Sequence, residues 1–196
     1  PEGFVFSTAK AGNFGGVAFA PSDIVRYVLA TGDVFMRFDA SDVGITKNLT
    51  AFYRQHMPAG TLNNFYLVFA ANVTLPGVGV VAPCDVVKFT PTSLGSNTAG
   101  TFSWYFDGSD VGLSAASEKI DALSLDNSGR LMISTTGGSS VPGLNFADED
   151  VVAFTPSSTG VNTAGTWSMS FDGSAAVANL GIEDVNGFWD DPSNDN

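Results

Sequence analysis

The chain has 196 residues, a length that fits one domain or one array of small repeats. Its 8 Lys and Arg stand against 20 Asp and Glu, a net charge of −12, and such a surface repels phosphate backbones and anionic lipids, so we expect no nucleic-acid partner. No apolar run reaches the ~18 residues of a membrane-spanning helix, so no membrane span is expected. The single cysteine, Cys84, allows no internal disulfide.

Strong acidity, few lysines and many Ser, Thr, Gly and Asn residues favour an extracellular or cell-surface protein. The first residue is Pro1 rather than Met, so we expect that an upstream segment, such as a targeting signal, has been removed.

Short strands separated by turn residues follow one another along the chain, and no stretch of useful length has helical periodicity. The first predicted strands are 4–9, 22–27 and 34–38, and the last of these runs into an acidic turn. The pattern then returns twice, each time with one more strand in front. The later strands are predicted at 48–53, 65–70, 84–89 and 101–106, at 119–124, 131–136, 149–154 and 166–171, and finally at 183–190.

The spacing of these phrases indicates true internal repetition. Phe38 and Phe106 are 68 residues apart, Phe106 and Phe171 are 65 apart, and residues 4–23 match residues 131–150 at a constant offset of 127 without a gap. We therefore predict an all-β fold of three repeats of about 65 residues. The predicted boundaries are 1–44 plus 182–192 for the first repeat, 45–112 for the second and 113–181 for the third.

Each repeat is predicted to be a four-stranded antiparallel meander, which is typical of a β-propeller blade, although a β-prism would also have threefold repetition. Strict alternation would place Phe102, Trp104 and Phe106 on one buried face of the last strand of a repeat.

The two ends of the chain look like the halves of one hairpin. The C-terminal segment is a first strand with no second strand after it, and the N-terminal segment is a second strand with no first strand before it. We predict that residues 183–190 complete the N-terminal repeat by pairing with residues 4–8, either in the same chain or in a neighbouring copy. Exchange between copies would give a closed dimer or a filament.

The phrases "FTPTSLGSNTAGTFSWYFDGSDVGL" and "LDNSGRLMISTTGGSSVPGLNFADEDVVAFTP" resemble a tandem β repeat of secreted or surface proteins of bacteria, mostly uncharacterised. The resemblance is strong over residues 84–172. It implies an exported repeat protein and no known reaction. The first copy departs from the motif at Ala40, where Gly is expected, and the last at Ala175, where an Asp is expected.

The acidic turns are candidate calcium ligands, because carboxylates two or three residues apart on a turn offer the oxygen atoms that Ca²⁺ prefers. The candidates are Asp39, Asp42, Asp107 and Asp110. The alternative is a solvated turn in which each Asp accepts backbone hydrogen bonds. No other cofactor is expected.

No catalytic motif is present. His56 is the only histidine and lies in a predicted loop, no G-x-S-x-G elbow occurs, and Cys84 stands where the other repeats have Ser22 and Glu149. We therefore predict a non-enzymatic structural or adhesive surface protein that self-associates through its ends. A carbohydrate-binding module that uses exposed tyrosines is the first alternative, with a glycan as partner, and a glycan-active hydrolase or lyase is the second.

Overall fold

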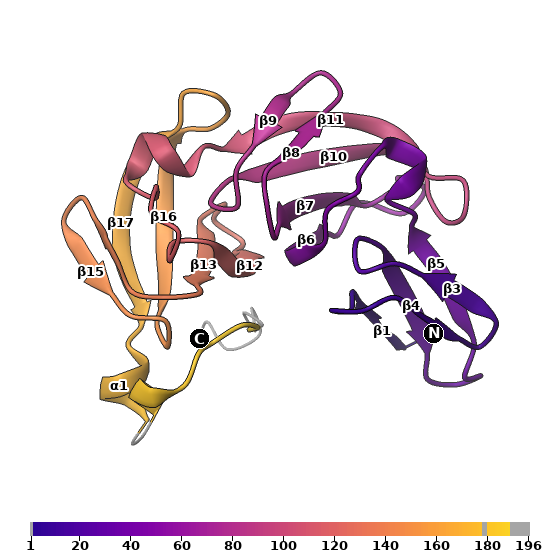
Figure 1. Cartoon of the computed structure of the whole chain (residues 1–196), viewed down its shortest axis with the longest axis horizontal. Coiled ribbons are helices and arrows are strands. Elements are labelled where there is room, and N and C mark those ends of the chain that lie inside the picture. The colour runs from indigo at the N-terminus through magenta and orange to yellow at the C-terminus, as the bar shows by residue number, and fades with distance from the viewer. Residues whose placement is uncertain (1, 178–179, 189–196) are drawn as a thin grey trace.

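The computed structural model describes residues 2–177 and 180–188, and this part of the chain is all-β, as predicted. The strands form three larger antiparallel sheets and three small hairpins. The described sheets form an open arc and do not close into a propeller ring (Figure 1).

The N-terminal sheet has three strands, and the other two sheets have four. The N-terminal sheet contains β1 (Gly3–Phe6), β4 (Ile24–Val28) and β5 (Val34–Phe38). The middle sheet contains β6 (Leu49–Gln55), β7 (Asn64–Phe69), β10 (Val86–Ser93) and β11 (Ala99–Phe106). The C-terminal sheet contains β12 (Ile120–Leu125), β13 (Leu131–Thr135), β16 (Val151–Ser158) and β17 (Ala164–Phe171).

The strand order is that of a simple meander. In the middle and C-terminal sheets the spatial order equals the chain order, and every pairing is antiparallel. A small hairpin is inserted between the second and third strands of each sheet, and these hairpins are β2 (Gly12–Phe14) with β3 (Val17–Phe19), β8 (Val73–Leu75) with β9 (Gly79–Val81), and β14 (Ser139–Val141) with β15 (Leu144–Phe146). The N-terminal sheet has the same order with the first strand missing.

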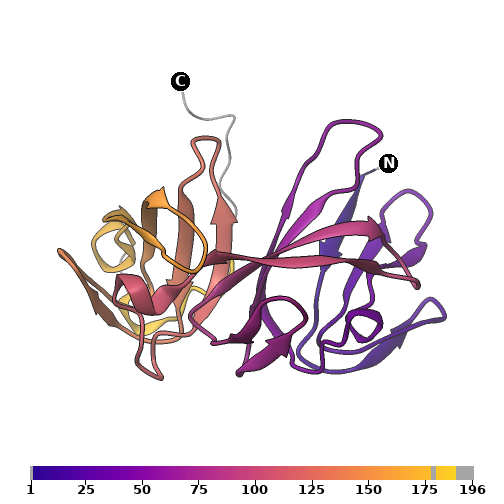
Figure 2. The ribbon, with the colours of Figure 1, turned by 90° about the horizontal axis from the view of Figure 1, so that it is seen from above.

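Two views place the N-terminal and C-terminal sheets on opposite sides of the middle sheet (Figures 1 and 2). The first strands β6 and β12 contact each other on the inner side of the arc. In the part of the chain that the structure describes, no helix has the length and apolarity to span a membrane.

A buried aspartate holds each sheet to the turn that follows its last strand. One carboxylate oxygen of Asp85 accepts the backbone N–H of Ala82 at 2.7 Å, and the other accepts that of Gly108 at 3.0 Å. Asp23 and Asp150 make the equivalent pairs of hydrogen bonds. These bonds explain why an Asp precedes the third strand of every repeat, since they satisfy both carboxylate oxygens and two loop N–H groups in a buried place.

The last strand of each sheet contains a β-bulge, and this bulge corrects the predicted alternation. In β11, Phe106 pairs with Val86 and Trp104 pairs with Val87, so Tyr105 is the extra residue. Phe102 and Trp104 therefore pack toward the N-terminal sheet, whereas Phe106 packs toward the C-terminal sheet. The prediction that all three share one face was wrong for Phe106.

Apolar side chains fill the spaces between neighbouring sheets. Phe38 lies between the N-terminal and middle sheets and contacts Phe65 and Phe89, and Phe106 lies between the middle and C-terminal sheets and contacts Phe154 and Trp167. Phe38 and Phe106 are both fully buried. The core is thus two layers between three sheets, so each sheet depends on its neighbour for burial.

The C-terminal segment does not pair with β1 in the described residues. After β17 come a short helix α1 (Gly173–Ala176) and a 3₁₀ turn η3 (Leu180–Ile182), and residues 183–188 form no strand. Val185 and Phe188 pack instead on Met132, Val151 and Ala153 of the C-terminal sheet. The predicted pairing of 183–190 with 4–8 is therefore absent within the single chain over 183–188, and residues 189–190 lie outside the described residues.

Candidate functional site

A cavity of about 360 Å³ lies at the centre of the arc, where four segments meet. The segments are three consecutive residues from β1 and its end, from β6, from β12 and from the C-terminal segment. The lining residues are Val5, Phe6, Ser7, Thr50, Ala51, Phe52, Asp121, Ala122, Leu123, Asn186, Gly187 and Phe188.

Three of these segments occupy equivalent positions in the internal repeat. Aligned by sequence, Thr50, Asp121 and Asn186 correspond to one another, as do the small residues Ala51, Ala122 and Gly187 that follow them. Equivalent positions thus present a hydroxyl, a carboxylate and an amide to a single cavity. Sequence reasoning missed this convergence, although the alignment of the three phrases contained the signal.

A shared backbone contact explains how the repeat brings these residues together. The N–H of Leu49 donates to Pro21 O at 3.3 Å, that of Ile120 to Pro83 O at 3.1 Å, and that of Val185 to Asp148 O at 3.0 Å. The three donors are equivalent in sequence, and so are the three acceptors. The C-terminal segment is therefore anchored to the C-terminal sheet by the same contact that anchors β6 and β12 to the sheets before them.

Asp121 is the most unusual side chain of the cavity. It is only 8% exposed, and neither of its carboxylate oxygens has a hydrogen-bond partner among the described residues. Burial first, and then the negative charge of Asp184, raise the pKa of Asp121 to about 7. An ionised carboxylate in such a place is costly unless a proton or a cation accompanies it.

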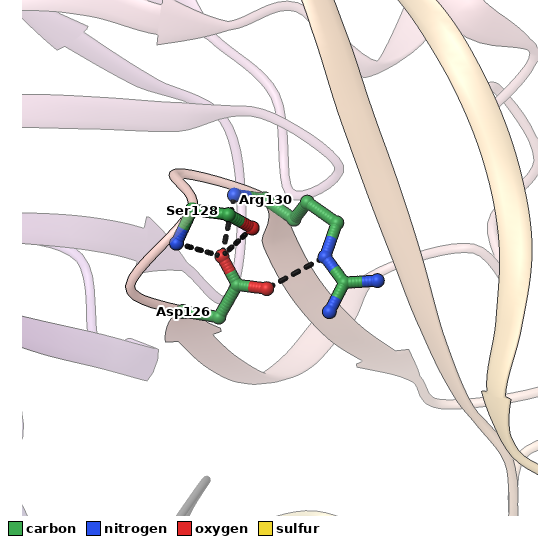
Figure 3. Close-up of polar contacts among 3 residues, drawn as sticks. All are labelled: Asp126, Ser128 and Arg130. Atoms are coloured by element: carbon green, nitrogen blue, oxygen red, sulfur yellow. Dashed lines mark hydrogen bonds and ion pairs between the residues drawn. The ribbon is translucent and has the colours of Figure 1, made fainter. Parts of the chain in front are cut away.

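Asp126, five residues further along the chain, shows the opposite arrangement (Figure 3). One of its oxygens accepts the N–H and hydroxyl of Ser128 and the N–H of Arg130, and the other forms an ion pair with Arg130 Nε at 2.6 Å. Burial opposes ionisation here, but the hydrogen bonds from Ser128 and Arg130 outweigh it and lower the pKa of Asp126. The two aspartates therefore differ in partners rather than in residue type.

The predicted calcium ligands lie between sheets and already accept hydrogen bonds. Asp107 accepts the hydroxyl of Ser109 at 2.7 Å, and Asp110 accepts the backbone N–H of Thr163 at 2.8 Å. The hydroxyl of Thr163 in turn accepts the N–H of Asp107 at 2.9 Å.

The N-terminal and middle sheets are joined in the same way. There Asp39 accepts the hydroxyl of Ser41, Asp42 accepts the N–H of Thr98 at 2.7 Å, and the Thr98 hydroxyl accepts the N–H of Asp39. We call each of these arrangements an inter-sheet clasp. Calcium binding by the four aspartates stays a prediction, and the hydrogen bonds show that their carboxylates join neighbouring sheets.

The other residues considered from the sequence lie apart from the cavity. His56 is exposed in the loop after β6, and Cys84 is a buried free thiol. Burial, followed by the charge of Asp85, raises the pKa of Cys84 to about 12. Such a thiol is a poor nucleophile.

The tyrosines considered for sugar stacking pack against one another. The rings of Tyr66 and Tyr105 meet edge to face at 4.7 Å between centroids, and Tyr53 lies 6.0 Å from Tyr66. All three belong to the core between the middle and C-terminal sheets. They therefore offer no open platform for a sugar ring, and this weakens the carbohydrate-binding alternative.

A scan against protein-family models finds no match for this chain, and a search of the curated proteins finds no relative.

Proposed function

We propose that this protein is a non-enzymatic structural or adhesive surface component that self-associates through the two ends of its repeat array. The single observation that carries the proposal is the anchored C-terminal segment. It is attached to the C-terminal sheet by the contact that β6 and β12 make, yet no strand of the described chain pairs with it.

The complementary end is the open edge of β1. In the other two sheets the strands equivalent to β1 are β7 and β13, and each pairs with a first strand, β6 or β12. Within the described residues β1 pairs only with β4. An open edge of this kind favours the addition of a strand from another chain.

An exposed apolar face lies beside this edge. Phe4 is 61% exposed and Phe14 is 49% exposed, and Phe6 and Tyr27 line the same hollow. The equivalent residues of the C-terminal sheet are Leu131, Val141, Ile133 and Phe154, and all four are buried against the middle sheet. The face of the N-terminal sheet thus has the apolar character of a face that another repeat covers.

A second copy of the chain fits both features. Its C-terminal segment would supply the missing first strand, and its C-terminal sheet would cover Phe4 and Phe14. Reciprocal exchange between two copies would give six sheets, which is within the usual range of ~4–8 for a closed propeller. One-way exchange would instead extend a filament.

The inter-sheet clasp is missing from this junction on both sides. Ala175 replaces the acceptor Asp of the earlier repeats, and the tight turn at residues 29–33 replaces the loop that carries the donor Thr. Contacts between copies would therefore be weaker than those inside the chain. We expect association to be reversible and dependent on concentration.

The test is the mass of the particle in solution, measured by sedimentation over a range of protein concentrations. The wild type is expected to associate, and Phe4→Glu with Phe14→Glu should leave a folded monomer, because both side chains are exposed in the single chain. Val80→Glu is the matched control, since Val80 is 60% exposed on β9, away from this face.

A second variant addresses the C-terminal segment. Deletion of residues 183–196 should also abolish association, and the truncated chain should then bind the 183–196 peptide. A wild type that stays monomeric at high concentration would overturn the proposal, as would association that survives the Phe4 and Phe14 substitutions.

The surface location is supported by composition, namely the net charge of −12 and the scarcity of lysine. Labelling of intact cells with an antibody against the chain would test it, because a cytoplasmic protein would be labelled only after the cells are opened.

A further inference from the structure

The central cavity holds a buried carboxylate whose hydrogen-bonding capacity is unused. Asp121 is more than nine-tenths buried, lines the cavity, and receives no hydrogen bond from the described residues on either oxygen. Elsewhere in the fold the buried aspartates accept two backbone N–H groups each, as Asp23, Asp85 and Asp150 do. The exception at Asp121 therefore calls for a ligand that supplies positive charge.

The neighbours of Asp121 supply oxygen atoms rather than positive charge. Asp184 is close enough that its charge acts directly on Asp121. The hydroxyl of Thr50 donates its proton to Ile120 O at 2.9 Å, which leaves the lone pairs of that oxygen free to bind a cation. The amide of Asn186 and the hydroxyl of Ser7 line the same cavity.

We propose that Asp121 and Asp184 bind a hard divalent cation, calcium, in the central cavity, with oxygens of Asn186, Thr50 and Ser7 as further ligands. Calcium takes 6–8 oxygen ligands in flexible geometry and accepts water among them, so two carboxylates with three neutral oxygens form a suitable partial shell. Nitrogen and sulfur ligands, which softer metals prefer, do not line the cavity.

The site would hold together parts of the chain that are far apart in sequence. Thr50 belongs to β6, Asp121 to β12, and Asp184 and Asn186 to the C-terminal segment, while Ser7 follows β1. A bound cation would link all three sheets to the C-terminal segment. This inference concerns the single chain and does not depend on association between copies.

The acidic turns are less suitable for the same ion. Each carboxylate of Asp39, Asp42, Asp107 and Asp110 already accepts a hydrogen bond from the protein. A cation there would have to replace those bonds, whereas at Asp121 it would replace none.

The test is calorimetric titration of chelator-treated protein with CaCl₂, together with thermal unfolding with and without calcium. It is done on the Phe4→Glu, Phe14→Glu chain so that association does not contribute. The expected result is one calcium per chain and a melting temperature that rises with calcium concentration, because a ligand of the folded state stabilises it by mass action.

Asp121→Asn and Asp184→Asn should each weaken calcium binding at least tenfold and remove the thermal shift. Asp126→Asn is the matched control, since Asp126 lies nearby with all its partners in the protein, and it should retain the shift. Absence of calcium binding to the parent chain would overturn the proposal, and so would Asp121→Asn binding calcium as tightly as the parent. The same titration with MgCl₂ is expected to show weaker binding, and equal or tighter binding of Mg²⁺ would overturn the assignment to calcium.

Discussion

The backbone N–H of Thr163 donates a hydrogen bond to Asp110 across 53 residues of sequence, at 2.8 Å. Thr163 is buried, and its hydroxyl also binds the backbone of Asp107 and of Gly160. The same contact between Thr98 and Asp42 joins the N-terminal and middle sheets. These clasps act together with the apolar layers to set the position of each sheet on its neighbour.

Removal of the acceptor should destabilise the fold. Asp110→Ala leaves a buried N–H without a partner, so we expect the free energy of unfolding to fall by about 1–3 kcal/mol, measured by urea unfolding. Ala175→Asp is the control at the equivalent position of the third repeat, where the described chain offers no partner loop, and it should change stability by less than about 0.5 kcal/mol. Equal effects of the two substitutions would show that the clasp contributes nothing.

Phe106 and Phe171 stand at equivalent positions but differ in burial. Phe106 is 1% exposed between two sheets, whereas Phe171 is 36% exposed at the end of the array. Phe106→Ala should lower the free energy of unfolding by about 3–5 kcal/mol. Phe171→Ala should cost at most about 1.5 kcal/mol in the monomer, because much of its surface is already in water. Similar costs in chemical unfolding would contradict the arrangement of the sheets.

The pH dependence of stability should carry the signature of Asp121 when calcium is removed by a chelator. Burial and then the charge of Asp184 raise its folded-state pKa to about 7, above its unfolded value of about 4. Between these values the folded chain holds a proton that the unfolded chain has released. The free energy of unfolding should therefore fall as pH rises from about 4 to about 7 and level off above that.

Asp121→Asn should flatten this part of the curve. Asp126→Asn should act in the opposite sense, because the lowered pKa of Asp126 contributes stability above about pH 4 that is lost as pH falls through its folded-state value. Urea unfolding at a series of pH values separates the two. A curve for Asp121→Asn that keeps the wild-type slope between pH 4 and 7 would rule out Asp121 as its source.

Cys84 should be inert in the folded protein. Its thiol is buried and its pKa is raised to about 12, first by burial and then by the charge of Asp85, so the reactive thiolate is scarce at neutral pH. Ellman's reagent at pH 8 should react with it only as the chain unfolds, and addition of urea should restore the rate of a free thiol. Fast labelling of the native chain would show that the core between the middle and C-terminal sheets opens readily.

The sequence alone determined the all-β class and the position of most strands, because alternating apolar residues and Asp-Gly turns are local signals that recur in register. It also singled out the aspartate before each third strand, but not its role, since the two N–H groups that Asp85 binds come from loops 23 residues apart. The β-bulge that turns Phe106 to the opposite face leaves no mark in the pattern of alternation.

The candidate site was decided by tertiary structure. Thr50, Asp121 and Asn186 are 71 and 65 residues apart in the chain, and only the curvature of the arc brings them to one cavity. Whether a carboxylate has partners depends on which N–H groups the fold places within hydrogen-bonding distance, and Asp126 and Asp121 show both outcomes within one strand and its turn. The sequence therefore determined which side chains repeat, and the packing of one sheet on the next determined which of them are left without a partner, because hydrogen bonding and burial are set by neighbours distant in the chain.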